Sequence, residues 1–145
     1  MSHLNYASTI HDGSSQDTFN NINAIHRKSV RHLLNMHPRD ELTDDHFKSL
    51  DILPLKKQYE FNKTLLVHKI YNERTPFYLC KLLRKATERY GSKNLISPLV
   101  RIDLIKNSLS FSGSTFWNAL PINLKNITSQ TLFKKKLKTK LINNT

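Results

Sequence analysis

Residues 54–71 read PLKKQYEFNKTLLVHKIY, and this stretch is the strongest helix signal in the chain. Its apolar residues recur at intervals of 4, 7 and 4 positions, as on one face of an α-helix. They are Leu55, Tyr59, Leu66 and Ile70. The predicted polar face carries Lys56, Glu60 and Lys63. Pro54 suits the first helical turn, where its missing N–H is not needed, so a long helix is predicted to about Tyr71.

Two weaker helix signals lie upstream of this stretch. Apolar positions from Ile22 to Leu34 approximate helical spacing and predict a first helix that stops before Pro38. Thr43, followed by two aspartates, predicts the N-cap of a short helix, because acids in the first turn offset the helix dipole. Residues 1–20 are polar and show no periodicity, so a disordered leader is expected there.

Two further helices are predicted downstream. Thr75 and Pro76 form an N-cap and first-turn pair for one of them. Its apolar stripe consists of Leu79, Leu82, Leu83 and Ala86. Ser129 can cap the last helix, and three residues with a spacing of four give that helix a single apolar line. These residues are Phe133, Leu137 and Leu141.

A small β-hairpin is predicted between these two helices. Residues 99–105 mostly alternate between apolar and charged side chains, and residues 109–111 supply a second short run beyond a polar turn. The expected fold is mainly α, with a single helical domain over residues 21–145 and this hairpin. A chain of 145 residues can bury about 68–70% of its unfolded surface, which suffices for a core. The predicted core includes Leu55, Tyr59, Leu66, Ile70, Leu79, Leu82, Phe111 and Trp117.

The formal net charge of +12 is unevenly distributed. Residues 1–26 contain no Lys or Arg, whereas residues 104–145 contain seven Lys and no acid. A positive field of this size attracts polyanions such as nucleic acid, but it is also found in solvated helical proteins. Charge alone therefore leaves both interpretations open.

Composition argues against several classes of protein. Cys80 is the only cysteine, which excludes a disulfide framework within the chain and a zinc site built on paired cysteines. The amino terminus lacks the features of a signal peptide, and no run of about 18 apolar residues occurs. We expect an intracellular protein, nuclear or cytoplasmic, that is neither secreted nor bound to a membrane.

Residues 107–124 carry no charge and contain the only tryptophan, Trp117. An uncharged neighbourhood favours burial of this ring in the core over stacking on a nucleic-acid base. Asn118 is expected to fix the local backbone before Pro121 rather than to bind a ligand.

Five short motifs follow one another along the chain. They are LDILPL (residues 50–55) leading to Tyr59, Pro76 with its helix, SPLVR (97–101), Ser112–Gly113 followed by WNALP (117–121), and Ser129 followed by FKKKLK (133–138). In this order and spacing, the chain resembles the carboxy-terminal region of non-LTR (LINE-type) retrotransposon reverse transcriptases. The resemblance covers about residues 22–145 and corresponds to the part downstream of the polymerase fingers, palm and thumb.

The resemblance implies an accessory region, or a remnant of such an element, without polymerase or nuclease activity. A polymerase of this kind holds two metal ions on paired aspartates at a strand turn. No such pair is found on a predicted strand, and Asp44–Asp45 is better explained by helix capping. No catalytic residue, metal site or cofactor is therefore expected. The implied partners are RNA or DNA and a reverse transcriptase body that this chain lacks.

The lysine-rich last helix is the main candidate site. In the functional hypothesis its lysines bind phosphates without sequence specificity and in a salt-sensitive manner, helped by cations elsewhere. The candidate nucleic-acid-binding residues are Lys134, Lys135, Lys136, Lys138, Lys140, Arg101, Arg27, Lys28 and Arg31. The candidate structural motif comprises Trp117, Asn118, Leu120 and Pro121. The alternative is a protein-interaction or structural helical module in which these lysines only face water.

Other chemistry has weaker support in the sequence. His26, His32 and His37 are separated by 6 and 5 residues, which does not give the i, i+4 pair of a helical zinc site. Cys80 and His68 could in principle pair as nucleophile and base, but no source of oxyanion donors is visible. Cys80 is better explained as a small core residue.

Overall fold

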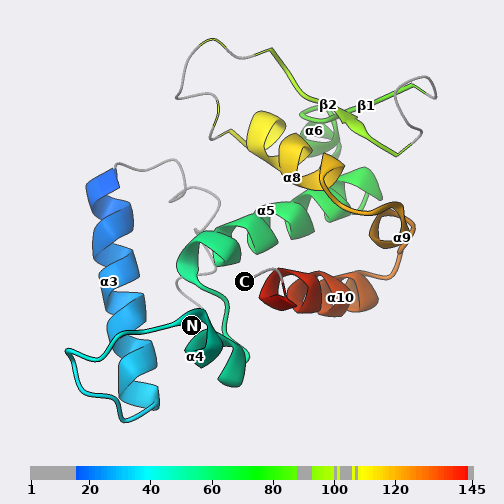
Figure 1. Cartoon of the computed structure of the whole chain (residues 1–145). Coiled ribbons are helices and arrows are strands. Elements are labelled where there is room, and N and C mark those ends of the chain that lie inside the picture. The colour runs from blue at the N-terminus through cyan, green and yellow to red at the C-terminus, as the bar shows by residue number, and fades with distance from the viewer. Residues whose placement is uncertain (1–15, 88–92, 100, 102–105, 107, 144–145) are drawn as a thin grey trace.

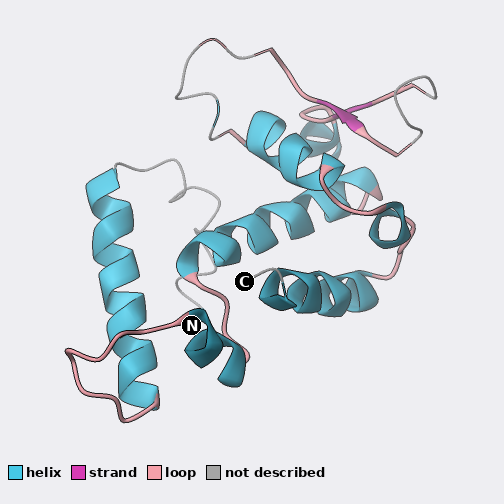
Figure 2. Ribbon diagram, in the orientation of Figure 1, coloured by secondary structure: helices cyan, strands magenta, loops and turns pink. Residues whose placement is uncertain are grey.

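The computed structural model describes residues 16–87, 93–99, 101, 106 and 108–143. These residues form a mainly helical protein with one small two-stranded antiparallel sheet, as the sequence predicts (Figure 2). The elements in chain order are α3 (Gln16–Leu33), α4 (Asp44–Ser49), α5 (Leu55–Tyr71), α6 (Phe77–Cys80), β1 (Arg84–Lys85), β2 (Leu95–Ile96), the π-helical turn η2 (Leu109–Gly113), α8 (Ser114–Asn118), α9 (Ile122–Lys125) and α10 (Gln130–Asn143). None of the helices within these ranges is sufficiently long and apolar to cross a bilayer.

Helix α5 is the central element, with α10 and α8 packed along it (Figure 1). The predicted core residues Leu55, Tyr59 and Ile70 are buried, whereas Leu66 is half-buried. Lys63, expected on the polar face, is only 1% exposed. Its ammonium donates a hydrogen bond to Ser112 Oγ at 2.9 Å, which lets a lysine remain inside. The prediction of a solvated Lys63 was therefore wrong, because its partner lies 49 residues away.

The π-helical turn η2 lies directly against α5. A Cβ atom added at Gly113 would lie 2.8 Å from Val67 Cγ2, closer than side-chain atoms pack. Glycine therefore permits this close approach. The approach also brings Ser112 to Lys63, so the Ser112–Gly113 motif fixes η2 on the central helix.

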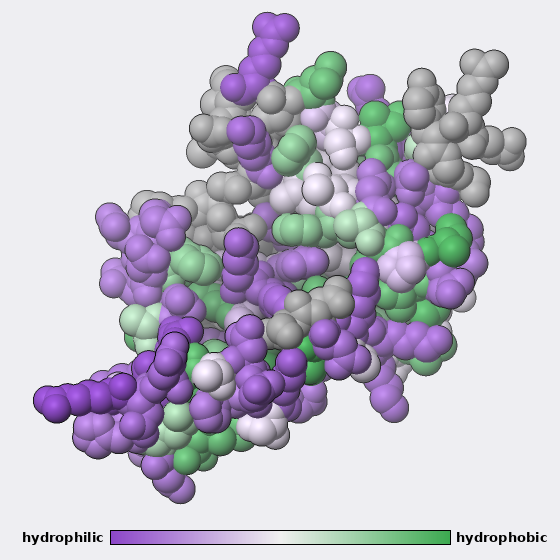
Figure 3. Space-filling model, viewed as in Figure 1, coloured by the Kyte–Doolittle hydropathy of each residue, from purple (hydrophilic) through white to green (hydrophobic). Residues whose placement is uncertain are grey.

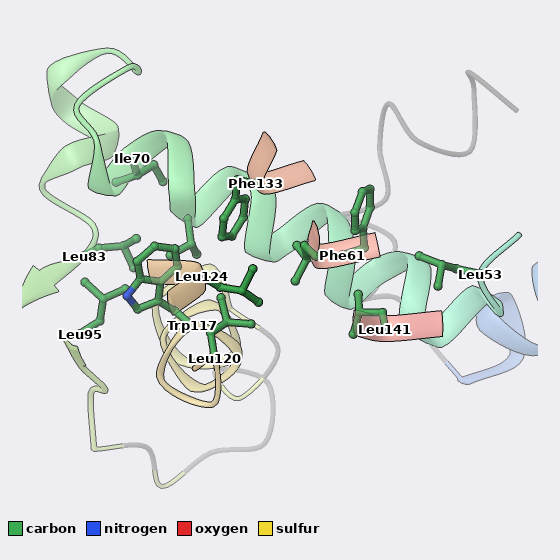
Figure 4. Close-up of a cluster of buried hydrophobic side chains, with 12 residues drawn as sticks. Leu53, Phe61, Ile70, Leu83, Leu95, Trp117, Leu120, Leu124, Phe133 and Leu141 are labelled. Carbon is green, nitrogen blue, oxygen red and sulfur yellow. The ribbon is translucent and has the colours of Figure 1, made fainter. Parts of the chain in front are cut away.

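The larger of two hydrophobic clusters surrounds Trp117, which is fully buried (Figure 4). Side chains from α5, α8, α9 and α10 meet in it, together with Leu83 and Leu95 from the sheet region. The predicted burial of Trp117 is confirmed. Leu79 and Phe111 are half-buried, and Leu82 is 47% exposed, so the prediction of Leu82 in the core was wrong.

A smaller cluster joins α3 to α4 through Val30, Leu42 and Phe47. Phe19 of α3 also packs edge-on against Tyr59 of α5, with ring centroids 6.0 Å apart. Helix α3 begins at Gln16, so the last five residues of the expected leader are helical. Residues 1–15 lie outside the described residues.

The hairpin was predicted in the wrong place. The observed sheet pairs Arg84 with Ile96 and Lys85 with Leu95, so the helix that begins after Pro76 ends at Cys80 instead of running to Ala86. Residues 109–111, predicted as a strand, are helical. Residues 100 and 102–105 of the other predicted strand lie outside the described residues.

A non-glycine residue with positive φ lies two positions beyond the last residue of three helices: Asn35 (52°) after α3, Asp51 (53°) after α4 and Glu73 (58°) after α5. After each, the next residue donates its backbone N–H to the carbonyl five positions earlier, as in a Schellman motif. The left-handed conformation is thus used to stop α3, α4 and α5 and to turn the chain.

Candidate nucleic-acid interface

Helix α10 is anchored by its predicted apolar line. Phe133, Leu137 and Leu141 are 0%, 1% and 5% exposed, respectively, and they pack in the larger cluster beside α5. The Lys57 ammonium of α5 donates a hydrogen bond to the Leu141 carbonyl at 3.2 Å, which satisfies a backbone acceptor near the end of α10. The burial of this line fixes which face of α10 can meet a partner.

His68 of α5 packs against Phe133 of α10. Its ring stacks on Phe133 with centroids 4.0 Å apart, and it is fully buried. Nε2 lies 2.7 Å from the Ile127 carbonyl oxygen, which requires Nε2 to carry the proton and donate it. Burial lowers the pKa of His68, and the charge of Arg74 lowers it further, against the opposing effect of the Ile127 hydrogen bond. The histidine is therefore neutral in the folded protein near pH 7.

Three of the five predicted phosphate-binding lysines of α10 are exposed: Lys134, Lys135 and Lys136. Each of the three lacks a carboxylate partner among the residues the structure describes. They are consecutive on a helix, so they point in different directions around its solvent-facing side. Their charges are available to a polyanion.

The other two lysines, Lys138 and Lys140, are half-buried and lie near carboxylates. Lys138 forms an ion pair with Asp51, which follows α4. Lys140 is close enough to Glu60 of α5 to oppose the rise in pKa that burial causes in that carboxyl group. The charge of Lys138 is thus partly neutralised by Asp51, and the structure separates these two half-buried lysines from the exposed trio.

A shallow groove of about 610 Å³ runs beside the exposed lysines, between α9 and α10. Pro121, Leu124 and Leu132 give it an apolar floor, and Lys135 and Lys136 lie on its edge. Figure 3 shows that hydrophilic side chains cover much of the face seen in Figure 1, with apolar side chains between them. The groove adds contact area next to the lysine trio.

The predicted basic residues of α3 are not brought to α10. The two helices are clearly separated in Figure 1, with α4 between them. Arg27 donates to the Leu42 carbonyl at 3.3 Å and Arg31 to the Asp40 carbonyl at 3.2 Å, so both hold the α3–α4 connection. Lys28 and Arg101 are exposed. Arg27 and Arg31 are thus engaged at the α3–α4 connection, away from α10.

The predicted structural motif around Trp117 joins two distant segments. Trp117 Nε1 donates to the Lys93 carbonyl at 2.8 Å. The Asn118 amide accepts from Leu95 N and donates to Leu95 O, both at 2.8 Å, and so pairs with β2 as a neighbouring strand would. Asn118 was expected to fix its own local turn. Instead it fixes a strand 23 residues earlier in the chain.

The remaining residues of this motif complete the join between α8 and α9. Leu120 is buried in the larger cluster, and Pro121 occupies the N-cap of α9, where its carbonyl accepts from Leu124 N at 3.0 Å. The buried Lys125 donates to the Asn118 carbonyl and to Asn94 Oδ1, each at 2.9 Å. Burial lowers the pKa of Lys125, and the charge of Lys140 lowers it further. The motif is a packing and hydrogen-bonding unit.

The other polar candidates do not converge. Within the described ranges, no group of three or more His, Cys, Asp or Glu side chains could hold a metal ion. His26 is buried against Phe47, whereas His32 and His37 are exposed. The half-buried Cys80 thiol contacts Thr75 and the Ile70 carbonyl, so its contacts are those of a packed residue.

Sequence reasoning gave no functional weight to Phe77 and Tyr78, which lie between Arg74 and Lys81. Both rings are strongly exposed in the structure. The available signal was the combination of two adjacent aromatic residues with a cation on either side of them. No protein-family model, curated protein or solved structure matches this chain.

Proposed function

We propose that this chain is a non-catalytic nucleic-acid-binding region related to the tail of a LINE-type reverse transcriptase, in which α10 contacts RNA or DNA phosphates. The observation that carries the proposal is the exposed trio Lys134, Lys135 and Lys136 on a helix whose opposite face is buried. The surrounding residues 104–145 contain no acid to compete with a phosphate. The sequence resemblance supports the same class of partner, and the single cysteine is consistent with a nuclear or cytoplasmic location.

Phosphate contacts by this trio would be insensitive to sequence and sensitive to salt. Each neutralised phosphate contributes about −0.9 to the slope of log affinity against log salt on duplex DNA, so three contacts give a slope of roughly −3. Lys138 and Lys140 add less because Asp51 and Glu60 already lie near them. Arg27, Lys28, Arg31 and Arg101 contribute to the long-range positive field.

The direct test is a fluorescence-anisotropy titration of single-stranded RNA and duplex DNA at several salt concentrations. Wild type is compared with a variant that carries Lys134→Gln, Lys135→Gln and Lys136→Gln. The matched control carries Arg39→Gln, Lys48→Gln and Lys56→Gln, which removes the same charge from other exposed positions. A slope that flattens only in the α10 variant supports the proposal. Equal slopes in both variants, or no binding at low salt, would refute it.

A second candidate function, a protein-interaction or structural module, is favoured by the outer surface of α3. Ile25 and Leu33 are 65% and 59% exposed, and they lie on a groove of about 690 Å³ completed by Met36 and Pro38. Exposed apolar side chains grouped in this way are typical of docking surfaces. In this function α3 would dock on a polymerase body, and Ile25→Ser with Leu33→Ser would abolish the association without changing the salt dependence of nucleic-acid binding. Retention of that association would count against this function.

A further inference from the structure

Helix α6 exposes two adjacent aromatic rings at a site distant from α10. Phe77 is 73% exposed and Tyr78 is 68% exposed. The other side of this short helix faces the protein, because Leu79 packs on the larger cluster and the Cys80 thiol reaches the Ile70 carbonyl. The core therefore anchors α6 while its two largest side chains point to solvent.

Cations flank these rings in the sequence. Residues 74–87 include Arg74, Lys81, Arg84 and Lys85 and contain no acid. The Lys81 ammonium lies 4.7 Å from the centre of the Phe77 ring, within cation–π range. Lys85 is paired with Glu73 at 3.0 Å, whereas Arg74, Lys81 and Arg84 have no carboxylate partner among the described residues. Lys81 thus lies beside the two exposed rings, and two further cations, Arg74 and Arg84, flank them in the sequence.

This combination matches the chemistry of one partner class. Single-stranded nucleic acid offers unstacked bases that lie on aromatic rings and phosphates that meet cations at the same time. A duplex keeps its bases stacked and would leave both rings unused, and an apolar protein surface would leave the cations unpaired. We propose that Phe77 and Tyr78, flanked by Arg74, Lys81 and Arg84, form a stacking site for single-stranded RNA or DNA.

The proposed stacking site is separate from the lysine trio. In Figure 1, α6 lies beside the sheet at one end of α5, whereas α10 lies on the other side of that helix. The inference shares its class of partner with the proposed function but depends on different residues. One site can therefore fail while the other is retained.

The test compares binding of an oligothymidylate of about 12 nucleotides with an abasic strand of equal length, because both carry the same phosphates and only one can stack. Wild type is expected to bind the thymidylate about 10-fold or more tightly than the abasic strand. Phe77→Ala with Tyr78→Ala should remove this preference and leave the salt slope unchanged. Phe77→Tyr with Tyr78→Phe should retain it, since both rings remain.

The matched control is Ile25→Ala with Leu33→Ala, which removes two apolar side chains of similar exposure from α3 and should keep the preference. Equal affinity of wild type for the two strands, or an unchanged preference in the alanine pair, would overturn the stacking site and indicate a protein-docking surface. The variant with Lys134, Lys135 and Lys136 changed to Gln separates the two proposals. In this variant the slope of log affinity against log salt should flatten, while the preference for the thymidylate over the abasic strand should be retained. Loss of that preference would contradict a separate site.

Discussion

Helices α10 and α3 are both basic and amphipathic, but they present opposite chemistry to solvent. Helix α10 buries its apolar line completely and exposes three lysines. Helix α3 buries His26 and Val30 but exposes Ile25 and Leu33, while two of its arginines bind backbone carbonyls. Net charge in a segment therefore does not show where its charge is available. The contacts of each cation decide that.

The largest expected difference between the two helices concerns their anchoring. Phe133→Ala removes a fully buried ring from the stack with His68 and should lower the free energy of unfolding by about 3–5 kcal/mol. Val30→Ala in the smaller cluster should cost about 2 kcal/mol. Urea unfolding followed by circular dichroism measures both. Equal losses would show that α3 is as tightly integrated as α10.

Lowering the pH is expected to have a smaller effect on stability. It acts through two buried histidines, His26 within α3 and His68, which contacts α10. Burial lowers the pKa of His68 and of His26, with Arg74 and Arg27, respectively, adding to the effect. The unfolded chain then binds protons more readily than the folded one as the pH falls below about 6.5, so stability decreases in that range and is retained above it.

Among the described residues, the Nδ1 atoms of both buried histidines have no hydrogen-bond partner, so protonation would place an unpaired donor inside each cluster. His68→Phe and His26→Phe should each reduce the stability lost between pH 7.5 and pH 5.5, as measured by urea unfolding at the two values. Only His68→Phe should also reduce the effect of acid on nucleic-acid binding, because only His68 contacts α10. The same effect in both variants would contradict this division.

The smallest effect concerns the ion pair between Lys138 and Asp51. Asp51→Asn should cost less than about 1 kcal/mol, as for most exposed pairs, and asparagine tolerates the positive φ at this position. By releasing Lys138, the change should steepen the salt slope of binding by up to about one. Asp17→Asn on α3 changes the charge equally and serves as the control. A steeper slope in both variants would indicate a general charge effect.

The regular helices could be predicted from sequence because their signals are local. The four-residue spacing of Phe133, Leu137 and Leu141 identified the buried face of α10, and the spacing around Tyr59 identified α5. In these helices, any apolar neighbouring surface is enough to bury the residues that recur at helical spacing. Local pattern and packing therefore agree.

The sheet and the buried polar residues could not be predicted because their partners are distant in sequence. Arg84–Lys85 leaves the helical pattern to pair with β2, and β2 is held on its other edge by the side chain of Asn118. Lys63 is buried because η2 supplies Ser112. Of the candidate site, the lysine trio was predictable, whereas the neutralisation of Lys138 depends on Asp51, 87 residues away.

The position of Trp117 makes it an intrinsic fluorescence probe of folding. The indole is fully shielded, stacks on Tyr71 with centroids 5.0 Å apart, and lies 6.2 Å from the His68 ring, which in turn touches Phe133 of α10. Its emission reports the packing between α5, α8 and α10 against no background from other tryptophans. A red shift would signal loosening of α10, while changes at Phe77 or Lys135 should leave the spectrum unaltered. Any variant of this protein can thus be checked for folding without a label.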